Sequence, residues 1–428
     1  MKYETMFLTS GKCSWGECYA CGWGRLTGPD PKTNKLKSII DRKFKGLHKS
    51  KRLRIFASGS FFDDKQFPRE VRKYIFNKAR DHGFKELVVE SRPEFITNDR
   101  LNDCKDIQLI VAIGLEVADN NILKKYRKGF TVENYIQAAE VLKICGCKLR
   151  TYLMVGMPFI KDHKKSLKKS VSLVKKYSDE IVLINTFPHR EAPIFDAWIA
   201  GKWKPLDKEE FKRLVDPYKG VETDFDNFAF VPKFHRDKEK WIKGATIKNL
   251  LHPYFEVWQD YLARFFEPPK ENDIAFFTMC SFKKPYRKST FFKNLLVTLK
   301  EIKNSDKLHI LVVSTPGVVP FELSYRYPFD KYDWPEWEET PKVKKKYLEV
   351  TEKRVYNYLK SHSKHYKKFY CYLKPDSESY QAVHNACKKL KIKIIDCIDK
   401  ENYELIKDMR NPLSTNEALS VLIKKLKI

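Results

Sequence analysis

In Cys13-Ser14-Trp15-Gly16-Glu17-Cys18-Tyr19-Ala20-Cys21, three cysteines fall within nine residues, spaced C-x4-C-x2-C. The run follows an apolar segment, Met6-Phe7-Leu8, that predicts a strand. Three thiolates on one loop can bind three irons of a cubane cluster, whereas a fourth cysteine would close the cluster for electron transfer. The spacing therefore predicts a [4Fe–4S] site with Cys13, Cys18 and Cys21 as metal ligands and one iron open to a small molecule.

A structural zinc site is the alternative. Such a site usually has four protein ligands, so a distant thiol such as Cys145 or Cys147 would have to complete it. The chain has ten cysteines, and its N-terminus lacks the apolar region of a signal peptide. We therefore expect a cytoplasmic protein whose thiols bind metal more often than they form disulfides.

Length and charge limit the class of protein. The 428 residues suggest two or three domains, and no apolar run approaches the roughly 20 residues of a membrane span. The 83 Lys and Arg exceed the 55 Asp and Glu, which gives a net charge of +28. Such an excess indicates a polyanionic partner, although a solvated surface rich in lysine would give the same count.

Strands and helices alternate through the first half of the chain. After the segment at Met6, apolar strands are expected at residues 53–57, 86–90, 107–113, 149–155 and 181–185, with helices at 68–82 and 132–144. This alternation predicts βαβ units and a parallel sheet of six strands. In such barrels the functional site lies at the C-terminal ends of the strands, where the cysteine run also falls.

Other polar groups follow these strand ends. Ser58-Gly59-Ser60 would let a ligand approach the backbone closely, although the same three residues are also typical of an ordinary tight turn. Glu90 and Arg92 could bind the hydroxyls and carboxylate of a ligand, or they could pair with each other at the surface. Glu116 ends the following strand.

A second α/β domain is expected from residue 271 to 428, after a linker and docking helix at 216–270. Its strands are expected at 274–277, 308–313, 367–373 and 392–397, in a doubly wound pattern that binds ligands at strand ends. Cys280 follows the first of them and is a candidate nucleophile, with Lys284 to activate it or bind an anion. A buried thiol beside a surface lysine is the alternative.

Five segments occur in the order found in radical S-adenosylmethionine enzymes: the cysteine run, Ser58-Gly59-Ser60-Phe61, Glu90-Ser91-Arg92-Pro93-Glu94, Gly114-Leu115-Glu116 and Lys128-Gly129-Phe130-Thr131. Residues 1–215 resemble that superfamily, especially the branch with the elongator catalytic subunit and RaSEA, the archaeosine-forming radical enzyme of archaea. The resemblance implies a partial (β/α)6 barrel, a [4Fe–4S] cluster and S-adenosylmethionine. It also implies S-adenosylmethionine contacts from six residues: Ser58, Gly59, Ser60, Glu90, Arg92 and Glu116.

The chain departs from that family at two places. The first cysteine gap is four residues, where three is commoner, and Ala20 occupies a position that is usually aromatic. Tyr19 or Trp23 would then supply the ring contact with the adenine.

The second domain resembles the core of archaeosine synthase, which adds lysine to the 7-cyano-7-deazaguanine base at position 15 of archaeal tRNA. The shared segments are Cys280-x3-Lys284-Pro285-Tyr286-x2-Ser289 and the run from Thr315 to Leu323. Met279 and Phe292 stand where that family has proline and histidine.

Together the two resemblances imply one pathway. We expect a radical C–N lyase that cleaves the lysine adduct of the deazaguanine base in tRNA and leaves archaeosine. Its expected partners are tRNA, an electron donor such as ferredoxin and a separate lysine-transferring archaeosine synthase, with no membrane. Two alternatives stay open: a bifunctional enzyme that also transfers lysine, and an RNA-binding protein with a structural metal site.

Overall fold

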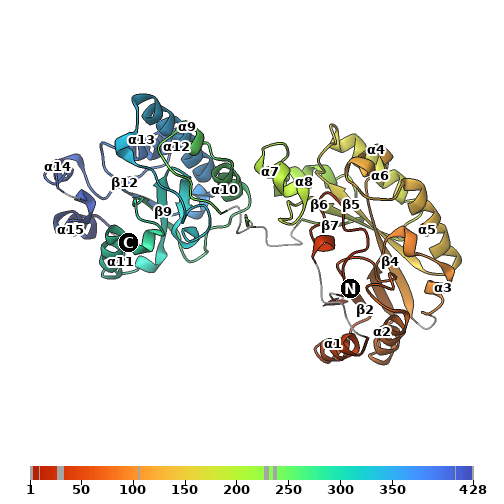
Figure 1. Cartoon of the computed structure of the whole chain (residues 1–428). Coiled ribbons are helices and arrows are strands. Elements are labelled where there is room, and N and C mark those ends of the chain that lie inside the picture. Colours follow the sequence, from red (N-terminus) through yellow and green to blue (C-terminus); the bar gives the residue numbers. More distant parts are fainter. Residues whose placement is uncertain are drawn as a thin grey trace. The chain divides into compact units, whose positions relative to one another are not determined.

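The computed structural model describes residues 3–8, 10–26, 33–104, 107–225, 231–234, 239–409 and 411–426. The chain forms two compact units, residues 1–229 and 230–428 (Figure 1). The boundary between them falls within residues 216–270, where the sequence analysis expected a linker and a docking helix. Within the described ranges, no helix has the length and apolar character needed to cross a membrane.

The N-terminal unit contains a curled, seven-stranded parallel sheet whose strands follow one another in chain order. The strands are β1 (Tyr3–Phe7), β2 (Arg52–Phe56), β3 (Glu86–Glu90), β4 (Gln108–Glu116), β5 (Lys148–Val155), β6 (Glu180–Asn185) and β7 (Glu222–Asp224). The sheet order begins with β1 and ends with β7, so the half-barrel is open. The six expected strands are confirmed. The sequence analysis missed β7, because three polar residues carry no strand pattern.

Helices connect these strands and cover the outer face of the sheet (Figure 1). They are α1 (Thr33–Lys45), α2 (Arg69–Asp81), α3 (Asn98–Leu101), α4 (Asn120–Lys125), α5 (Val132–Ile144), α6 (His163–Val174), α7 (Pro193–Ile199) and α8 (Lys208–Val215). Thr131 begins α5 with a capping box, and Gly146 follows its end at a φ of 69°. These local signals explain why the sequence predicted α5 correctly.

The two faces of the sheet have different chemistry. In β4, Leu109, Val111 and Ile113 join the large apolar core beneath the helices. The alternate residues Ile110 and Ala112 face the other way and pack only with Val88 and Tyr152. Successive side chains of a strand point to opposite faces, so the concave face of the half-barrel carries a thin apolar lining.

Paired charges fill the end of the concave face where the strands begin. Arg52 opens β2 and contacts Glu86 and Glu180, which lie near the starts of β3 and β6, at 2.7 Å each. Arg150 lies beside Glu180 in the sheet register and contacts it at 2.6 Å. Each of these buried or half-buried charges therefore has an opposite charge beside it, as burial requires.

The C-terminal unit contains a five-stranded sheet in the order β10-β9-β8-β11-β12, with β10 antiparallel to β9. The strands are β8 (Ile274–Met279), β9 (Leu308–Ser314), β10 (Gly317–Pro320), β11 (Lys368–Tyr372) and β12 (Ile395–Asp396). The helices are α9 (Ile247–Leu250), α10 (Pro253–Arg264), α11 (Thr290–Lys300), α12 (Pro341–His362), α13 (Glu378–Lys389), α14 (Lys400–Glu404) and α15 (Asn416–Lys425).

Two features of this unit differ in detail from the sequence pattern. Helix α10, expected to dock, packs against α12 and β10 within the unit itself. Strand β10 lies in the run from Thr315 to Leu323, where the sequence analysis expected no strand, and β12 pairs over two residues only. Short edge strands depend on tertiary packing more than on local propensity, so their bounds are poorly encoded.

The charge cluster at the start of the strands predicts the effect of one substitution. Glu180→Ala removes the shared partner of Arg52 and Arg150 and should lower the free energy of unfolding by about 3 kcal/mol. Urea unfolding followed by circular dichroism measures this difference. Glu349→Ala breaks the exposed pair with Lys346 and should change stability by no more than about 0.5 kcal/mol. Equal effects of the two variants would contradict a structural role for the cluster.

Candidate active site

The three cysteines lie on the loop after β1, and all three thiols are free and half-buried. The loop is tight: a Cβ on Gly24 would lie 3.2 Å from the Cβ of Cys13. The backbone N–H of Gly24 also lies 3.4 Å from the sulfur of Cys21 and donates to it. The loop backbone therefore packs directly around the thiols that the sequence selected.

The spacing of the sulfurs distinguishes a cluster from a zinc ion. In the described part of the chain, one group of His, Cys, Asp and Glu side chains brings three ligand atoms within 4.8 Å of one another, and it contains none of these cysteines. A tetrahedral zinc ion would hold sulfurs about 3.8 Å apart, given Zn–S bonds of about 2.3 Å. Thiolates that each bind a different iron of a cubane stand farther apart. The three sulfurs are therefore not gathered around one point, which is compatible with ligands to separate irons of a cluster.

Cations surround these thiols. Burial raises the pKa of Cys18, while the nearby Lys128 and Arg92 act in the opposite direction. Burial likewise raises the pKa of Cys21, partly offset by the Gly24 N–H. Without metal the two thiols therefore stay protonated at neutral pH, and metal binding would release their protons.

The turn after β2 is held by Gln66, which the sequence analysis did not select. Its side chain accepts from the backbone N–H of Ser60 at 2.7 Å and donates to Ser10 O at 3.0 Å. A Cβ on Gly59 would lie 3.0 Å from the Cα of Cys13 and 2.2 Å from the Gln66 side-chain oxygen. The glycine is therefore needed because the cysteine loop approaches it, whether or not a ligand also does.

Arg92, just after β3, joins several loops. Its backbone N–H donates to Ser60 Oγ at 3.1 Å, and its Nη1 donates to Lys128 O at 2.9 Å. The guanidinium lies 5.2 Å from the ring centres of both Trp15 and Phe130. Its ion-pair partner is Glu94 rather than Glu90.

One nitrogen of Arg92 has no partner. Nη2 is buried and makes no hydrogen bond to any described residue. An unsatisfied guanidinium donor is costly, and guanidinium groups match carboxylates well. This orphan donor fits an anionic ligand group, such as the carboxylate of an amino-acid moiety.

Glu116 ends β4 in an unusual backbone conformation. Its φ is 69°, and the β4–β5 register shifts between Gly114 and Glu116. The carboxylate accepts from Lys128 Nζ at 2.6 Å. A non-glycine residue held at positive φ stores strain and is common at functional sites. Lys128 lay within a quoted motif but was not selected, because its contact with Glu116 depends on the fold.

Glu90 is the third carboxylate of this region. Its pKa is raised to about 7, because burial outweighs the N–H donated by Ala57, and Glu116 adds repulsion. Arg150 and Lys128 lower the pKa by smaller amounts. A carboxyl group that titrates near neutrality is typical of functional sites.

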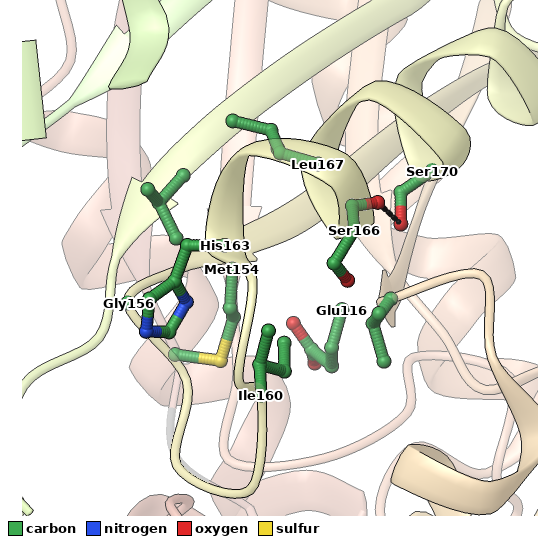
Figure 2. A pocket seen from close by; sticks show the side chains of 10 residues that line it. Glu116, Met154, Gly156, Ile160, His163, Ser166, Leu167 and Ser170 are labelled. Carbon is green, nitrogen blue, oxygen red and sulfur yellow. Dashed lines mark hydrogen bonds between the residues drawn. The ribbon is translucent and has the colours of Figure 1, made fainter. Parts of the chain in front are cut away.

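A small pocket opens beside Glu116. Figure 2 shows the Glu116 carboxylate near Ile160 and Ser166, with Met154 and His163 on the opposite side. The lining comes from the ends of β4 and β5, the loop after β5 and the start of α6. The pocket therefore lies at the strand ends, as expected for an α/β site.

Aromatic groups flank the cysteine loop. The ring of Tyr19 lies 5.0 Å from that of Phe159, which is 43% exposed, and 6.0 Å from that of Tyr126. Trp23 contacts His189 at 5.5 Å, and a Cβ on Gly22 would meet the His189 ring. His189 was not selected, although its position after β6 could have marked it.

In the C-terminal unit, Cys280 and Lys284 follow β8, as expected. Lys284 Nζ donates to the carbonyls of Ser281 at 2.5 Å and Phe282 at 3.3 Å. Burial lowers the pKa of Lys284, and a negative Cys280 would raise it. The two groups are therefore close enough to interact electrostatically.

The other motif residues of this unit lie in its core. Tyr286 and Tyr332 are buried and share a hydrogen bond of 2.7 Å, and Tyr332 also contacts Ser314 Oγ. Phe292 is fully buried and stacks on Tyr286, with ring centres 5.4 Å apart. Phe282 and Trp337 form an exposed ring pair 5.5 Å apart at the rim.

Residues 7–169 match the model of the radical SAM superfamily, and residues 255–413 match a domain of unknown function, DUF5591. The N-terminal unit is thus a radical SAM domain, and its family implies a [4Fe–4S] cluster and S-adenosylmethionine as cofactors. This finding confirms the first resemblance seen in the sequence.

Curated relatives cover parts of the chain. An uncharacterised protein of Methanocaldococcus jannaschii is 33% identical over 41% of this chain and 52% of its own length. The archaeosine synthase subunit beta of Methanosarcina acetivorans is 27% identical over 48% of this chain and 63% of its own. The archaeosine synthase subunit alpha of Thermoplasma acidophilum is 32% identical over 24% of this chain and 20% of its own. The chain spans less than two thirds of the length of each.

The raised pKa of Glu90 predicts a pH dependence. Because its folded pKa, about 7, exceeds the reference value of 4.5, neutral Glu90 favours the fold at low pH. That contribution is lost as the pH rises from 4.5 to about 7. Relative to Glu90→Gln, the cofactor-free protein should therefore lose stability over this window and change little above it. Thermal melting at a series of pH values tests this, and a wild-type melting temperature that stays constant or rises relative to Glu90→Gln between pH 4.5 and 7 would contradict it.

Proposed function

We propose that this chain, whose N-terminal unit is a radical SAM domain, is a radical enzyme that forms archaeosine in tRNA. The observation that carries the proposal is the pairing of similarities on one chain. One curated relative is named archaeosine synthase subunit beta, and another is named archaeosine synthase subunit alpha. The net charge of +28 supports a polyanionic substrate.

The site residues have distinct roles in this proposal. Cys13, Cys18 and Cys21 would hold the cluster, and the buried Nη2 of Arg92 would bind the carboxylate of S-adenosylmethionine. When bound, the cofactors supply a 5′-deoxyadenosyl radical that abstracts hydrogen from the substrate. The glutamates at the ends of β3 and β4 lie in the same region and would contact the hydroxyl and amino groups of the bound nucleoside.

The proposed substrate is the lysine adduct of the 7-deazaguanine base at position 15. Hydrogen abstraction from the lysine side chain would weaken its bond to the terminal nitrogen. Cleavage of this C–N bond would leave the nitrogen on the base and release the lysine carbons as an unsaturated amino acid, and uptake of one electron and one proton by the nitrogen would complete the formamidine of archaeosine. Two electrons per turnover would then be required, one to cleave S-adenosylmethionine and one for the nitrogen, and a donor such as ferredoxin would provide them.

The C-terminal unit would bind the tRNA. Tyr286 is buried, so a base could stack on the exposed rings of Phe282 and Trp337 instead. Phe292 is buried in an aromatic stack and cannot transfer protons. We therefore assign lysine transfer to a separate archaeosine synthase that prepares the substrate.

A bifunctional enzyme is a second candidate, favoured by one observation. Lys284 has a lowered pKa and lies close enough to Cys280 to interact with it, as in activated nucleophile pairs. In that case the chain would also form the lysine adduct from free lysine and tRNA carrying the cyano base.

The decisive experiment uses the full chain reconstituted with iron and sulfide under anaerobic conditions. Incubation with S-adenosylmethionine, a reductant and lysine-adduct tRNA should give archaeosine and 5′-deoxyadenosine, both detected by mass spectrometry. Cys18→Ala should abolish both products because an open cubane needs all three thiolates. Cys145→Ala removes a half-buried thiol that follows the C-terminal end of α5 and should keep both products.

Other outcomes separate the alternatives. Formation of 5′-deoxyadenosine without archaeosine would contradict the proposed substrate but would still support radical cleavage of S-adenosylmethionine. Bound zinc with no cleavage of S-adenosylmethionine would instead indicate an RNA-binding protein. Adduct formation from free lysine and cyano-base tRNA, lost in Lys284→Ala, would make the chain bifunctional.

A further inference from the structure

Three potential metal ligands converge at the edge of the C-terminal sheet. Cys371 lies on β11, Asp396 on β12 and His384 on α13. One ligand atom from each lies within 4.8 Å of the other two, and no other such group occurs among the described residues. These residues lie outside both sequence motifs discussed above.

The backbone explains why these side chains meet. Cys371 and Asp396 are direct partners in the parallel β11–β12 pair. Side chains of paired residues point to the same face of a sheet, so the thiol and the carboxylate are neighbours. Helix α13 connects the two strands and brings His384 Nε2 to 2.9 Å from Asp396 Oδ1. The group is therefore fixed by three elements of regular structure.

The separations suit one small cation. Zinc binds sulfur at about 2.3 Å and nitrogen or oxygen at about 2.0–2.2 Å, so its tetrahedral ligands lie about 3.3–3.8 Å apart. The three atoms already fall near that range, and small rotations of His384 and Asp396 would complete it. One sulfur, one imidazole nitrogen and one carboxylate oxygen form a donor set that suits zinc.

A neighbouring side chain fixes the carboxylate. The hydroxyl of Tyr380 donates to Asp396 Oδ2 at 2.9 Å, which leaves Oδ1 directed to the group. The Tyr380 and His384 rings also pack against each other, with centres 4.1 Å apart. Partners that orient metal ligands in this way are a regular part of metal sites.

Two of the three side chains are partly exposed, so a metal ion could reach the group from solvent. Cys371 is only 1% exposed, but the side chains of His384 and Asp396 are 29% and 30% exposed. The group thus has a closed sulfur side and an open side toward solvent. A water molecule can occupy the fourth position there, as at zinc sites with three protein ligands.

We propose that Cys371, His384 and Asp396 form a zinc site that fastens β12 to β11 and α13. Strand β12 pairs over only two residues, so backbone hydrogen bonds hold it weakly. A metal bound by both strands and by the connecting helix would fix this edge. The site is separate from the cysteine loop of the radical SAM domain and does not depend on the proposed function.

The test uses the full chain carrying Cys13→Ala, Cys18→Ala and Cys21→Ala, so that metal on the N-terminal loop is removed. This protein, purified with zinc and then desalted, should retain one zinc per chain by elemental analysis. Replacement by Co²⁺ should give a sulfur-to-cobalt charge-transfer band and the intense visible bands of a tetrahedral ion. Zinc should also raise the melting temperature, because it binds the folded state.

Substitution of the two partly exposed side chains keeps the test independent of core packing. His384→Gln and Asp396→Asn, each added to the triple variant, should reduce zinc occupancy at least tenfold and remove the melting shift. Cys397→Ala is the matched control, because this buried cysteine directly follows Asp396 but is not a member of the group of converging ligand atoms. It should leave zinc occupancy unchanged. No bound zinc in the triple variant, or zinc that survives both substitutions, would overturn the proposal and leave His384 and Asp396 as a simple ion pair.

Discussion

The N-terminal site depends on Arg92, because this one residue joins the loops that follow four strands. Trp15 lies after β1 and contacts one side of the guanidinium, and Phe130 lies after β4 and contacts it as well. Ser60 lies after β2 and accepts from the backbone N–H of Arg92, while Lys128 O accepts from Nη1. Only a planar guanidinium can donate in several directions and also lie against aromatic rings. Arg92 therefore fixes the cysteine loop relative to the rest of the strand ends.

The charges around Arg92 are balanced within the same region. The backbone carbonyl of Lys128 accepts a hydrogen bond from Arg92, and its ammonium group donates one to Glu116. Two cations and one anion therefore lie beside the thiols. The cations favour the thiolate form of Cys18, which burial opposes. At the opposite ends of the strands, Arg52 and Arg150 share Glu180. The half-barrel thus holds paired charges where its strands begin, whereas the unpaired Nη2 of Arg92 and the strained backbone of Glu116 lie where they end, at positions that a ligand can compensate.

The sequence predicted the regular parts of the fold and most of the candidate site. Apolar runs and helix caps were sufficient for β4 and α5, because their signals are local. Strand β7 was missed and the bounds expected for β12 were too long, because strands of two or three residues form only when a neighbouring strand supplies the partners. Likewise, Gln66 and the ammonium group of Lys128 join the site through contacts across many residues. No spacing in the sequence encodes those contacts, and the group at Cys371 was missed for the same reason.

The role of Arg92 is tested most directly by hydrogen–deuterium exchange of the cofactor-free Arg92→Lys variant. The substitution keeps a positive charge but removes the planar group between Trp15 and Phe130. If Arg92 holds the loops together, amide exchange should become faster in residues 10–26 and 124–131 at the same time, with β2, β3 and β4 still protected. Faster exchange confined to the residues next to Arg92 would contradict this account.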